Sequence, residues 1–538
     1  MMGFDRKLAT AIIETAAFSE AIMSGARSIA SAVALSALLF SVDCGAARAQ
    51  GAAAPVWPTQ QWPTSTPEAQ GMDSAALAKL LAFGTSRSLD SLLIARHGRI
   101  VLDAYYAPYT PDIPHAVNSS TKAVVGTLAA IAHKEGLLDS YDHKMLDFFA
   151  DRTIANLDDR KKAITVQNLL DMTSGLEWEE GITGGREQSL ADWSRSPNLV
   201  QFVLDRPMAH DPGELFYYDS GNPHLVSAII TRLTGMKASD YAAAKLFGPL
   251  GIATSYWRQD PQGISTGGGG LYLLPRDMAK IGYLYLRRGQ WEGRQIVPLE
   301  WIDRVNHATV DMNAAFDPAL RYANFFWALP DKHVYMSVGY HCQVIMVLPE
   351  RDVVAVLTAR DFCPFGRTAD MIAGAVTSDT ALPPDAAGTA LLVNALHEIS
   401  TEKPSAVGVT PALASAISGK SYQFPGNALN IKMMSLTLAD ANPRFDLEIT
   451  APGITSLKFG GPIGLDGLYR KGEPTVFGMT AFKGMWSDDR SFVIDAQFLG
   501  AGEQRKWTLS FDGERPTLHG KARDGSEVSV AAEPAVLH

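Results

Sequence analysis

The sequence predicts an α+β domain at residues 57–378 and a separate all-β domain at 405–538, joined by a linker at 379–404 that holds one short helix. Strand-like runs at both ends of a long helical region favour an antiparallel sheet with an inserted helical part. The C-terminal region instead alternates apolar and polar residues between glycine-containing turns, as in a sandwich or barrel. At 538 residues the chain also exceeds what one hydrophobic core normally serves.

The elements of the first domain follow one another in a readable order. A hairpin pattern begins at Ser91 in "SLLIARHGRIVLDAYYAP". A helix-patterned run through Val124 comes next and stops at Gly136, and a largely helical stretch continues to Leu250. From Val334, "VYMSVGYHCQVIMVLPERDVVAVLTAR" gives two strand-like runs around a turn.

The second domain is predicted from strict alternation. In three separate runs the apolar residues recur at every second position, which places them on one face of a strand. These runs are Phe445, Leu447 and Ile449; Phe492, Ile494, Ala496 and Phe498; and Trp507, Leu509 and Phe511. The sequence leaves open whether the strands form a sandwich or a barrel.

Residues 1–49 are predicted to be an export signal. A basic residue precedes the apolar run Ser28–Val42, and Ala47 and Ala49 occupy the small-residue positions of a cleavage site. Met23 is a candidate for the true first residue, because the residues before it make the segment longer than a typical signal peptide. The run is short for a membrane span, although an uncleaved anchor is the alternative. We therefore expect a bacterial protein that is periplasmic or secreted, without stable membrane insertion after cleavage.

Composition excludes several classes of function. Hydrophobic residues make up 46% and charged residues 19%, which is typical of globular proteins rather than disordered ones. The net charge of -10, with no basic run, argues against nucleic acid as a partner.

After the signal only Cys342 and Cys363 remain as cysteines, and one disulfide or two unrelated buried thiols are both possible. No metal-binding spacing is present, so no metal is predicted.

A serine and a lysine three residues apart mark the start of the helix-patterned run, in "NSSTK". Residues i and i+3 share a helix face, so Ser119 and Lys122 are predicted to project side by side. A serine becomes a nucleophile when a neighbouring base takes its proton, and a buried, neutral lysine can be that base. The N–H of Ser119 is a candidate oxyanion donor. A chain of this length holds about one such motif by chance, so a helix cap with a surface lysine is the alternative.

Tyr218 and Ser220 lie two residues apart in "GELFYYDSGNPHLVSAIITRLTG", just before another helix-patterned run. A tyrosine near a lysine can pass the serine proton to the leaving group, and such help is worth about 10² to 10⁴ in rate. Taken alone, Tyr218 could equally be a packed aromatic side chain.

His341, Cys342 and Gln343 begin an apolar strand in "SVGYHCQVIMVLP". A strand edge beside the nucleophile can supply a second oxyanion N–H, worth roughly 10² to 10³ in rate. We expect His341 to contact substrate or to make a structural hydrogen bond rather than to act as a base.

Gly267 to Gly270 is predicted to be a flexible loop near the pocket, because the Gly-Lys-Ser/Thr of a phosphate-binding loop does not follow it.

The first motif, Ser119 with Lys122, the second, Tyr218 with Ser220, and the third, His341 to Gln343, follow one another along the chain. In this order they resemble the three sequence boxes of the serine β-lactamase and penicillin-binding-protein superfamily. The segments "TVQNLLDMTSGLEWEE", "LFGPLGI", "GGGGLYLLPRDMAKIGYLYLRRGQW" and "IVPLEWI" also look like its landmarks, and the resemblance spans Trp57 to Ala375. Tyr-x-Ser, with His341 near the usual lysine box, is most similar to the 6-aminohexanoate-dimer hydrolase and class C-like esterase branch. The resemblance implies a β-lactamase/transpeptidase-like fold, an antiparallel sheet with a helical subdomain.

The resemblance also implies roles for individual residues. Ser119 would be the acylated nucleophile, Lys122 its proton acceptor and Tyr218 the proton shuttle, while Ser220 would fill the polar position of the second box. Residues His341 to Gln343 would stand in for the third box, although Lys-Thr-Gly is absent and Cys342 stands where a small Gly is common. The cation that grips a β-lactam or peptide carboxylate is therefore missing, which favours a neutral substrate.

The predicted function is a serine hydrolase that cleaves a small amide or ester through an acyl-enzyme and needs no cofactor. One alternative is a β-lactamase, D-Ala-D-Ala carboxypeptidase or D-aminopeptidase. The other is a non-catalytic binding protein that keeps the fold. No catalytic contribution is expected from the C-terminal domain.

Overall fold

The computed structural model describes residues 55–535 with seven short gaps. The gaps are 182–187, 254, 313–316, 362–363, 452–453, 476–477 and 523–525. The predicted signal at 1–49 lies outside the described residues. Within the described part of the chain, no helix combines the length and the apolar character needed to cross a membrane.

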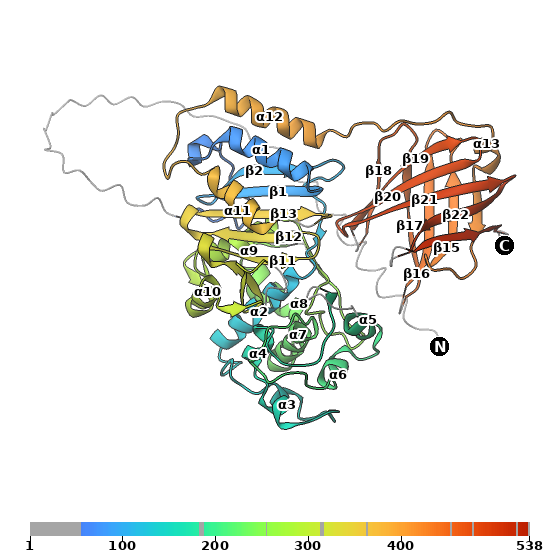
Figure 1. The fold of residues 1–538 in the computed structure, drawn as a ribbon. Helices are drawn as coiled ribbons and strands as arrows, with labels where there is room; N and C mark the ends of the chain where they lie inside the picture. Colours follow the sequence, from blue (N-terminus) through green and yellow to red (C-terminus); the bar gives the residue numbers. More distant parts are fainter. Residues whose placement is uncertain are drawn as a thin grey trace, which may run out of the picture. The chain divides into compact units, whose positions relative to one another are not determined.

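An eight-stranded antiparallel sheet forms the centre of the first domain (Figure 1). In spatial order its strands are β2 (Arg99–Tyr105), β1 (Leu89–Arg96), β13 (Val353–Ala359), β12 (Gln343–Leu348), β11 (Val334–Gly339), β10 (Phe326–Leu329), β9 (Arg321–Ala323) and β8 (Val310–Asp311). Because β1 pairs with β13, the two ends of the domain meet in one sheet. The predicted α+β arrangement is confirmed.

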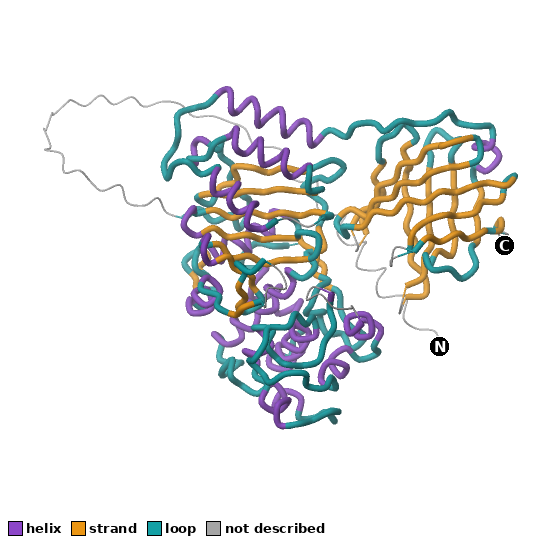
Figure 2. Tube along the Cα trace, in the orientation of Figure 1, coloured by secondary structure: helices purple, strands orange, loops and turns teal. Residues whose placement is uncertain are grey.

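Helices cover this sheet and explain its sequence pattern (Figure 2). The helix α9 (Pro275–Leu286) packs on β12 and β13, and α1 (Ser74–Thr85) packs on β1 and α11 (Phe365–Gly374). Every residue of β13 is buried. A strand covered on both faces needs apolar side chains in succession rather than in alternation, which accounts for the run VVAVLTA.

The helical region lies between the strands of this sheet in sequence. Its helices are α2 (Ser120–Lys134), α3 (Asp159–Ala163), α4 (Val166–Leu170), α5 (Gln188–Arg195), α6 (Leu199–Leu204), α7 (Gly221–Thr234) and α8 (Ala238–Ala242), and α10 (Leu299–Asn306) follows α9. The helix α2 packs against both α7 and β11. A small sheet of β3 (His115–Ala116), β5 (Leu271–Leu273) and β4 (Tyr256–Trp257) leads into α2.

The C-terminal region is an all-β domain whose sheet closes almost completely. Its elements are α13 (Leu413–Ile417), β14 (Lys420–Gln423), β15 (Ile431–Thr437), β16 (Arg444–Ala451), β17 (Ile454–Gly464), β18 (Arg470–Thr475), β19 (Gly478–Asp488), β20 (Ser491–Leu499), β21 (Glu503–Asp512), β22 (Arg515–Lys521), β23 (Glu527–Ala531) and β24 (Glu533–Pro534). The strand β23 pairs with β22 at one edge, whereas β24 pairs with β14 at the other. Only Ala532 separates β23 from β24, so the sheet is a nearly closed barrel rather than a sandwich.

The predicted linker contains more structure than a short helix. The helix α12 (Ala386–Ser400) packs on α1 and β2, and Leu392 is buried in the core of the first domain. A separate hydrophobic core fills the barrel. The domain boundaries at 379 and 405 stay predictions.

Candidate active site

The chain turns sharply before α2, and this turn presents Ser119. Asn118 has a φ of 48°, a left-handed conformation that asparagine adopts more readily than most residues. Ser119 follows as the N-cap of α2, and its side chain makes no capping hydrogen bond. The predicted helix start is therefore confirmed, but the Ser119 hydroxyl is not used as a cap.

Lys122 points its amine at Ser119 instead of into solvent. Its Nζ donates to Ser119 Oγ at 2.8 Å and to the carbonyl oxygen of Gly268 at 2.8 Å, and the residue is 1% exposed. The amine also lies 4.7 Å from the centre of the Tyr218 ring. The alternative of a solvated surface lysine is therefore wrong.

Burial increases the neutral fraction of the Lys122 amine near neutral pH. Loss of hydration disfavours the ammonium form and lowers the pKa of Lys122 to about 8, although the nearby carboxylates of Glu180 and Asp219 oppose this effect. A substantial fraction of the amine is then neutral at pH values where an exposed lysine would be almost fully charged.

Tyr218 reaches the same point from the segment just before α7. Its side chain is 1% exposed, and its hydroxyl is a hydrogen-bond partner of the Ser119 hydroxyl. Burial, reinforced by the charge of Glu180, raises the pKa of Tyr218. The phenol therefore keeps its proton, and the structure places a hydroxyl donor beside the Ser119 hydroxyl.

Ser220 lies in the same cluster but serves a different partner. Its Oγ donates to Glu180 Oε1 at 2.7 Å and its backbone N–H donates to Glu180 Oε2 at 2.9 Å. Trp178 Nε1 also donates to Oε2 at 2.9 Å. The Ser220 hydroxyl therefore donates its hydrogen bond to a buried carboxyl group, and the predicted substrate contact of Ser220 stays a prediction.

Two buried carboxyl groups set the charge around Lys122. Glu180 is 5% and Asp219 is 1% exposed. Burial, together with repulsion from Glu180, raises the pKa of Asp219 to about 8. One lysine facing two carboxyl groups gives the site little net positive charge, so the described residues here offer poor attraction for an anionic substrate.

The third motif is a tight turn between β11 and β12 that is hydrogen-bonded to both residues flanking Ser119. Asn118 Nδ2 donates to the carbonyl of Tyr340 at 3.1 Å, and Ser120 Oγ donates to the carbonyl of Gln343 at 2.7 Å. A Cβ on Gly339 would lie 2.2 Å from the carbonyl of Val117, so only glycine allows this approach. The predicted strand edge beside Ser119 is present.

The three residues singled out in this turn differ in exposure and partners. His341 and Cys342 have φ values of 59° and 62°, and burial lowers the pKa of His341. Gln343 is 2% exposed, and its Nε2 donates to the carbonyls of His341 at 3.2 Å and Ala359 at 2.7 Å. The Gln343 side chain therefore braces the turn, and the substrate contact predicted for the turn rests on His341 and the backbone.

Cys342 is disulfide-bonded and 1% exposed. Of the two alternatives left by the sequence, unrelated buried thiols are therefore wrong for Cys342. Cys363, the other cysteine in the disulfide alternative, lies outside the described residues.

The glycine run contributes directly to the site. Gly268 supplies the carbonyl that accepts from Lys122, and Thr266 Oγ1 donates to the carbonyl of Gly269 at 2.6 Å. The segment lies at the site, as predicted, but hydrogen bonds fix its backbone. No sequence pattern identifies this acceptor, because every residue carries a carbonyl.

Glu180 was also missed, although it ends the quoted segment "TSGLEWEE". A glutamate in an acidic pair is ordinarily a surface residue, and its burial against Ser220 depends on contacts across 40 positions of sequence.

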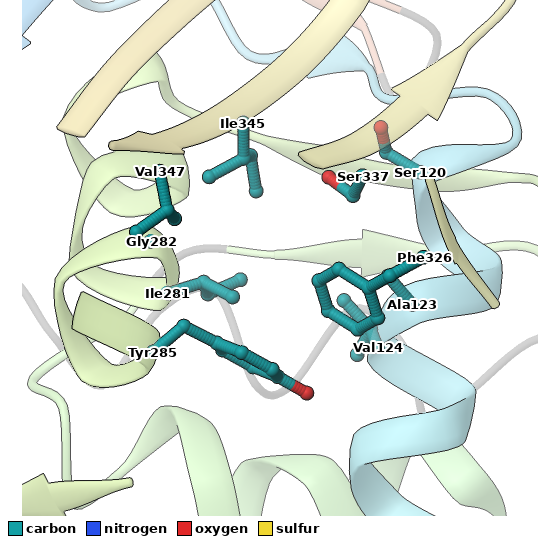
Figure 3. A pocket seen from close by; sticks show the side chains of 10 residues that line it. All are labelled: Ser120, Ala123, Val124, Ile281, Gly282, Tyr285, Phe326, Ser337, Ile345 and Val347. Carbon is teal, nitrogen blue, oxygen red and sulfur yellow. The ribbon is translucent and has the colours of Figure 1, made fainter. Parts of the chain in front are cut away.

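A small cavity of about 10 Å³ lies between α2, α9 and the sheet (Figure 3). Ser120, rather than Ser119, lines it, with Val124, Ile281, Tyr285 and Phe326 among the apolar neighbours. Its size is about that of one water molecule, so it is no substrate pocket.

The described residues hold no cluster of three or more His, Cys, Asp or Glu side chains suited to a metal ion.

Part of the chain matches a known protein family. The family described as Beta-lactamase matches residues 76–376, which is more than half of the chain.

Among curated proteins, the 6-aminohexanoate-dimer hydrolase of Paenarthrobacter ureafaciens is 24% identical over 287 residues, covering 50% of this chain and 71% of that protein. The monacolin J acid methylbutanoyltransferase of Aspergillus terreus is 28% identical over 163 residues, covering 27% of this chain and 38% of that protein.

Solved structures give similar matches. A structure described as "EstCE1, a hydrolase with promiscuous acyltransferase activity" aligns with a TM-score of 0.48 at 16% identity, over 57% of this chain and 99% of its own. The octameric penicillin-binding protein homologue from Pyrococcus abyssi aligns with a TM-score of 0.44 at 17% identity, over 85% of this chain and 100% of its own.

Proposed function

Because the chain belongs to the beta-lactamase family, we propose that it is a serine hydrolase that cleaves a small amide or ester through an acyl-enzyme on Ser119. One observation carries the proposal: the buried amine of Lys122 lies 2.8 Å from Ser119 Oγ. An amine with a pKa of about 8 can accept the hydroxyl proton as Oγ attacks.

Ser119, Lys122 and Tyr218 are sufficient to carry out both acylation and deacylation. Ser119 Oγ forms a bond to the substrate carbonyl carbon while its proton passes to Lys122 Nζ. The bond between the carbonyl carbon and the leaving nitrogen or oxygen then breaks as Tyr218 donates its proton to that atom, and Tyr218 is reprotonated from Lys122. Water then attacks the Ser119 ester and passes a proton to Lys122, the bond between the carbonyl carbon and Oγ breaks, and Lys122 returns the proton to Oγ, which releases the acid and restores the serine hydroxyl.

The substrate class follows from the charges of the site. The third box holds His341 and a disulfide-bonded Cys342 where a cation would grip a carboxylate. The similar protein from Paenarthrobacter ureafaciens is named for hydrolysis of the 6-aminohexanoate dimer. Both observations favour a neutral amide or ester at the reacting end over a β-lactam.

A probe and a substrate panel test this function. We expect a fluorophosphonate to label wild type and to leave Ser119→Ala unlabelled. Against p-nitrophenyl esters, short D-amino-acid amides and a chromogenic cephalosporin, we expect turnover of esters or amides and none of the cephalosporin. Equal labelling of a folded Ser119→Ala would refute the proposal, and acylation without product release would favour the non-catalytic binding protein.

We also propose that the protein is exported. The predicted signal and the disulfide at Cys342 support this, because disulfides persist in oxidising compartments. N-terminal sequencing of protein purified from the periplasm or medium should begin at Gln50. Recovery of the full-length chain from the cytoplasm alone would contradict export.

A further inference from the structure

The Gly268 carbonyl is the second acceptor of the Lys122 amine, so the position of the glycine run decides where the amine points. A charged or neutral amine with one acceptor can rotate about its long side chain, whereas two acceptors fix it. The segment that carries Gly268 is itself held by a buried histidine.

His224, on α7, meets the glycine run through one ring nitrogen. The backbone N–H of Gly267 donates to His224 Nδ1 at 3.3 Å. A backbone amide can only donate, so Nδ1 must be the acceptor and the ring proton must reside on Nε2. The tautomer of His224 is thereby defined by its neighbour.

The other ring nitrogen meets a carboxylate. His224 Nε2 lies 3.1 Å from Asp260 Oδ2, and neither side chain has exposed surface. Asp260 Oδ1 is occupied by the backbone N–H groups of Gln262 at 2.8 Å and Ile264 at 2.9 Å. Although burial opposes it, the hydrogen bond from His224 helps to lower the pKa of Asp260. Asp260 is therefore an ionised acceptor for the Nε2 proton.

Close packing makes this arrangement exacting. A Cβ on Gly267 would lie 2.0 Å from the carbonyl of Pro223, and one on Gly268 would lie 2.9 Å from Ser220 Cβ. Trp193 packs edge-on against the His224 ring, with centroids 5.4 Å apart. The glycine run thus sits directly on the start of α7, where it has no room to shift while His224 holds it.

We propose that His224 and Asp260 are positioning residues that fix the Gly267–Gly268 backbone, so that the Gly268 carbonyl holds the Lys122 amine against Ser119. The inference rests on the proposed function for its kinetic consequence, but the orientation of Lys122 can be measured separately. Nothing in the sequence assigns either residue, since a histidine within a helix and an aspartate in a loop are ordinary structural residues.

Asp260→Asn tests the proposal with almost no change in shape. The two backbone N–H groups retain the amide oxygen at the Oδ1 position, which leaves the amide NH₂ facing His224 Nε2. Nε2 must then accept, and the ring proton moves to Nδ1, where it opposes the Gly267 N–H. We expect the plateau rate of p-nitrophenyl ester hydrolysis to fall by about 10- to 100-fold.

The pH profile separates positioning from general loss of structure. A carbonyl that accepts from an amine stabilises its ammonium form, so withdrawal of Gly268 should lower the pKa of Lys122 and move the acid limb of the rate profile to lower pH. Ser227→Ala is the matched control, since Ser227 Oγ donates to the carbonyl of Ser265 at 2.7 Å from the same helix. It should lower the melting temperature while leaving the limb in place.

A second variant guards against simple misfolding. His224→Asn keeps an acceptor near the Nδ1 position while losing the bond to Asp260, so it should recover more of the rate than His224→Phe. If both variants lose the rate equally, or if Asp260→Asn behaves like Ser227→Ala in rate and pH limb, the proposal is overturned.

Nuclear magnetic resonance of the full chain distinguishes this failure from failure of the proposed function. Titration of the ¹³Cε signal of Lys122, identified by its absence in Lys122→Met, reports the pKa of the amine without any substrate. If folded wild type neither turns over nor is labelled, the proposed function fails. A lower Lys122 pKa in Asp260→Asn would still support the positioning role, and an unchanged one would overturn it.

Discussion

Two serines begin two neighbouring helices with almost the same backbone, yet only one faces a base. Ser119 precedes α2 with φ and ψ of -68° and -11°, and Ser220 precedes α7 with -69° and -11°. Neither side chain caps its helix. Ser119 Oγ meets the amine of Lys122, whereas Ser220 Oγ donates to the carboxylate of Glu180.

The partner, rather than the helix terminus, therefore decides what each serine can do. An amine can accept the hydroxyl proton and release a nucleophile. A buried carboxylate that also accepts from a backbone N–H and an indole uses the hydroxyl as one more donor, and so holds Ser220 in place.

Replacement of Lys122 should have the largest effect on the difference between Ser119 and Ser220. We expect Lys122→Met to lower the rate of fluorophosphonate labelling by about 10² to 10⁴-fold, because Ser119 then lacks a proton acceptor. Lys161→Met is the matched control, since Lys161 is also buried but donates to the carbonyls of Ala155 and Leu204. If both variants lose labelling to the same extent, Lys122 serves structure only.

Tyr218→Phe should have the next largest effect, and the size should depend on the leaving group. An amide leaves as a poor anion unless protonated, so its hydrolysis should fall by about 10²-fold, while a p-nitrophenyl ester should lose much less. Tyr285→Phe controls for loss of a buried phenol, since its hydroxyl bonds Thr127 and Trp301. Equal losses for amide and ester would argue against a proton shuttle.

The pH dependence should follow Lys122, and Glu180→Gln should shift it. The amine must be neutral to accept a proton, so the wild-type rate should rise as pH increases through about 8. Glu180 raises the pKa of Lys122, so its neutral replacement should move this rise to lower pH. Rate profiles from pH 5 to 10 measure both, with Asp171→Asn as the control carboxyl. A rise that stays in place would mean that Glu180 does not influence the amine.

Ser220→Ala should have the smallest effect on chemistry. The variant removes one donor to a buried carboxylate, which should cost about 1–3 kcal/mol in the free energy of unfolding, measured by urea denaturation. Labelling at Ser119 should fall less than in Tyr218→Phe. Loss of labelling as complete as in Ser119→Ala would make the two serines functionally equivalent and contradict the contrast.

Much of this site could be predicted because its signals are local. The spacing of Ser119 and Lys122 fixes a shared helix face, and the alternation around Phe445 and Trp507 fixes strands. What escaped prediction depends on contacts between distant segments: the carbonyl of Gly268, 146 positions from Lys122, and the carboxylate of Glu180 beside Ser220.

The fold shows the same division. Strand and helix types follow from periodicity, whereas the closure of the barrel depends on which edges meet, and the packing of α12 depends on a partner helix near the start of the domain. The alanine- and proline-rich composition of residues 379–404 is typical of a linker. The surface that Leu392 packs against belongs to distant segments, so this packing could not be predicted from the linker sequence.

The closure of the barrel has a consequence for degradation. A peptide bond cut near Ala532 would separate β24 from β23, and dissociation of the short strand β24 would then expose the edge of β14. Exposed edges are templates for pairing between chains. A single nick by a protease at this junction would therefore turn a self-contained domain into one prone to aggregate, while the residues around Ser119 stayed chemically intact.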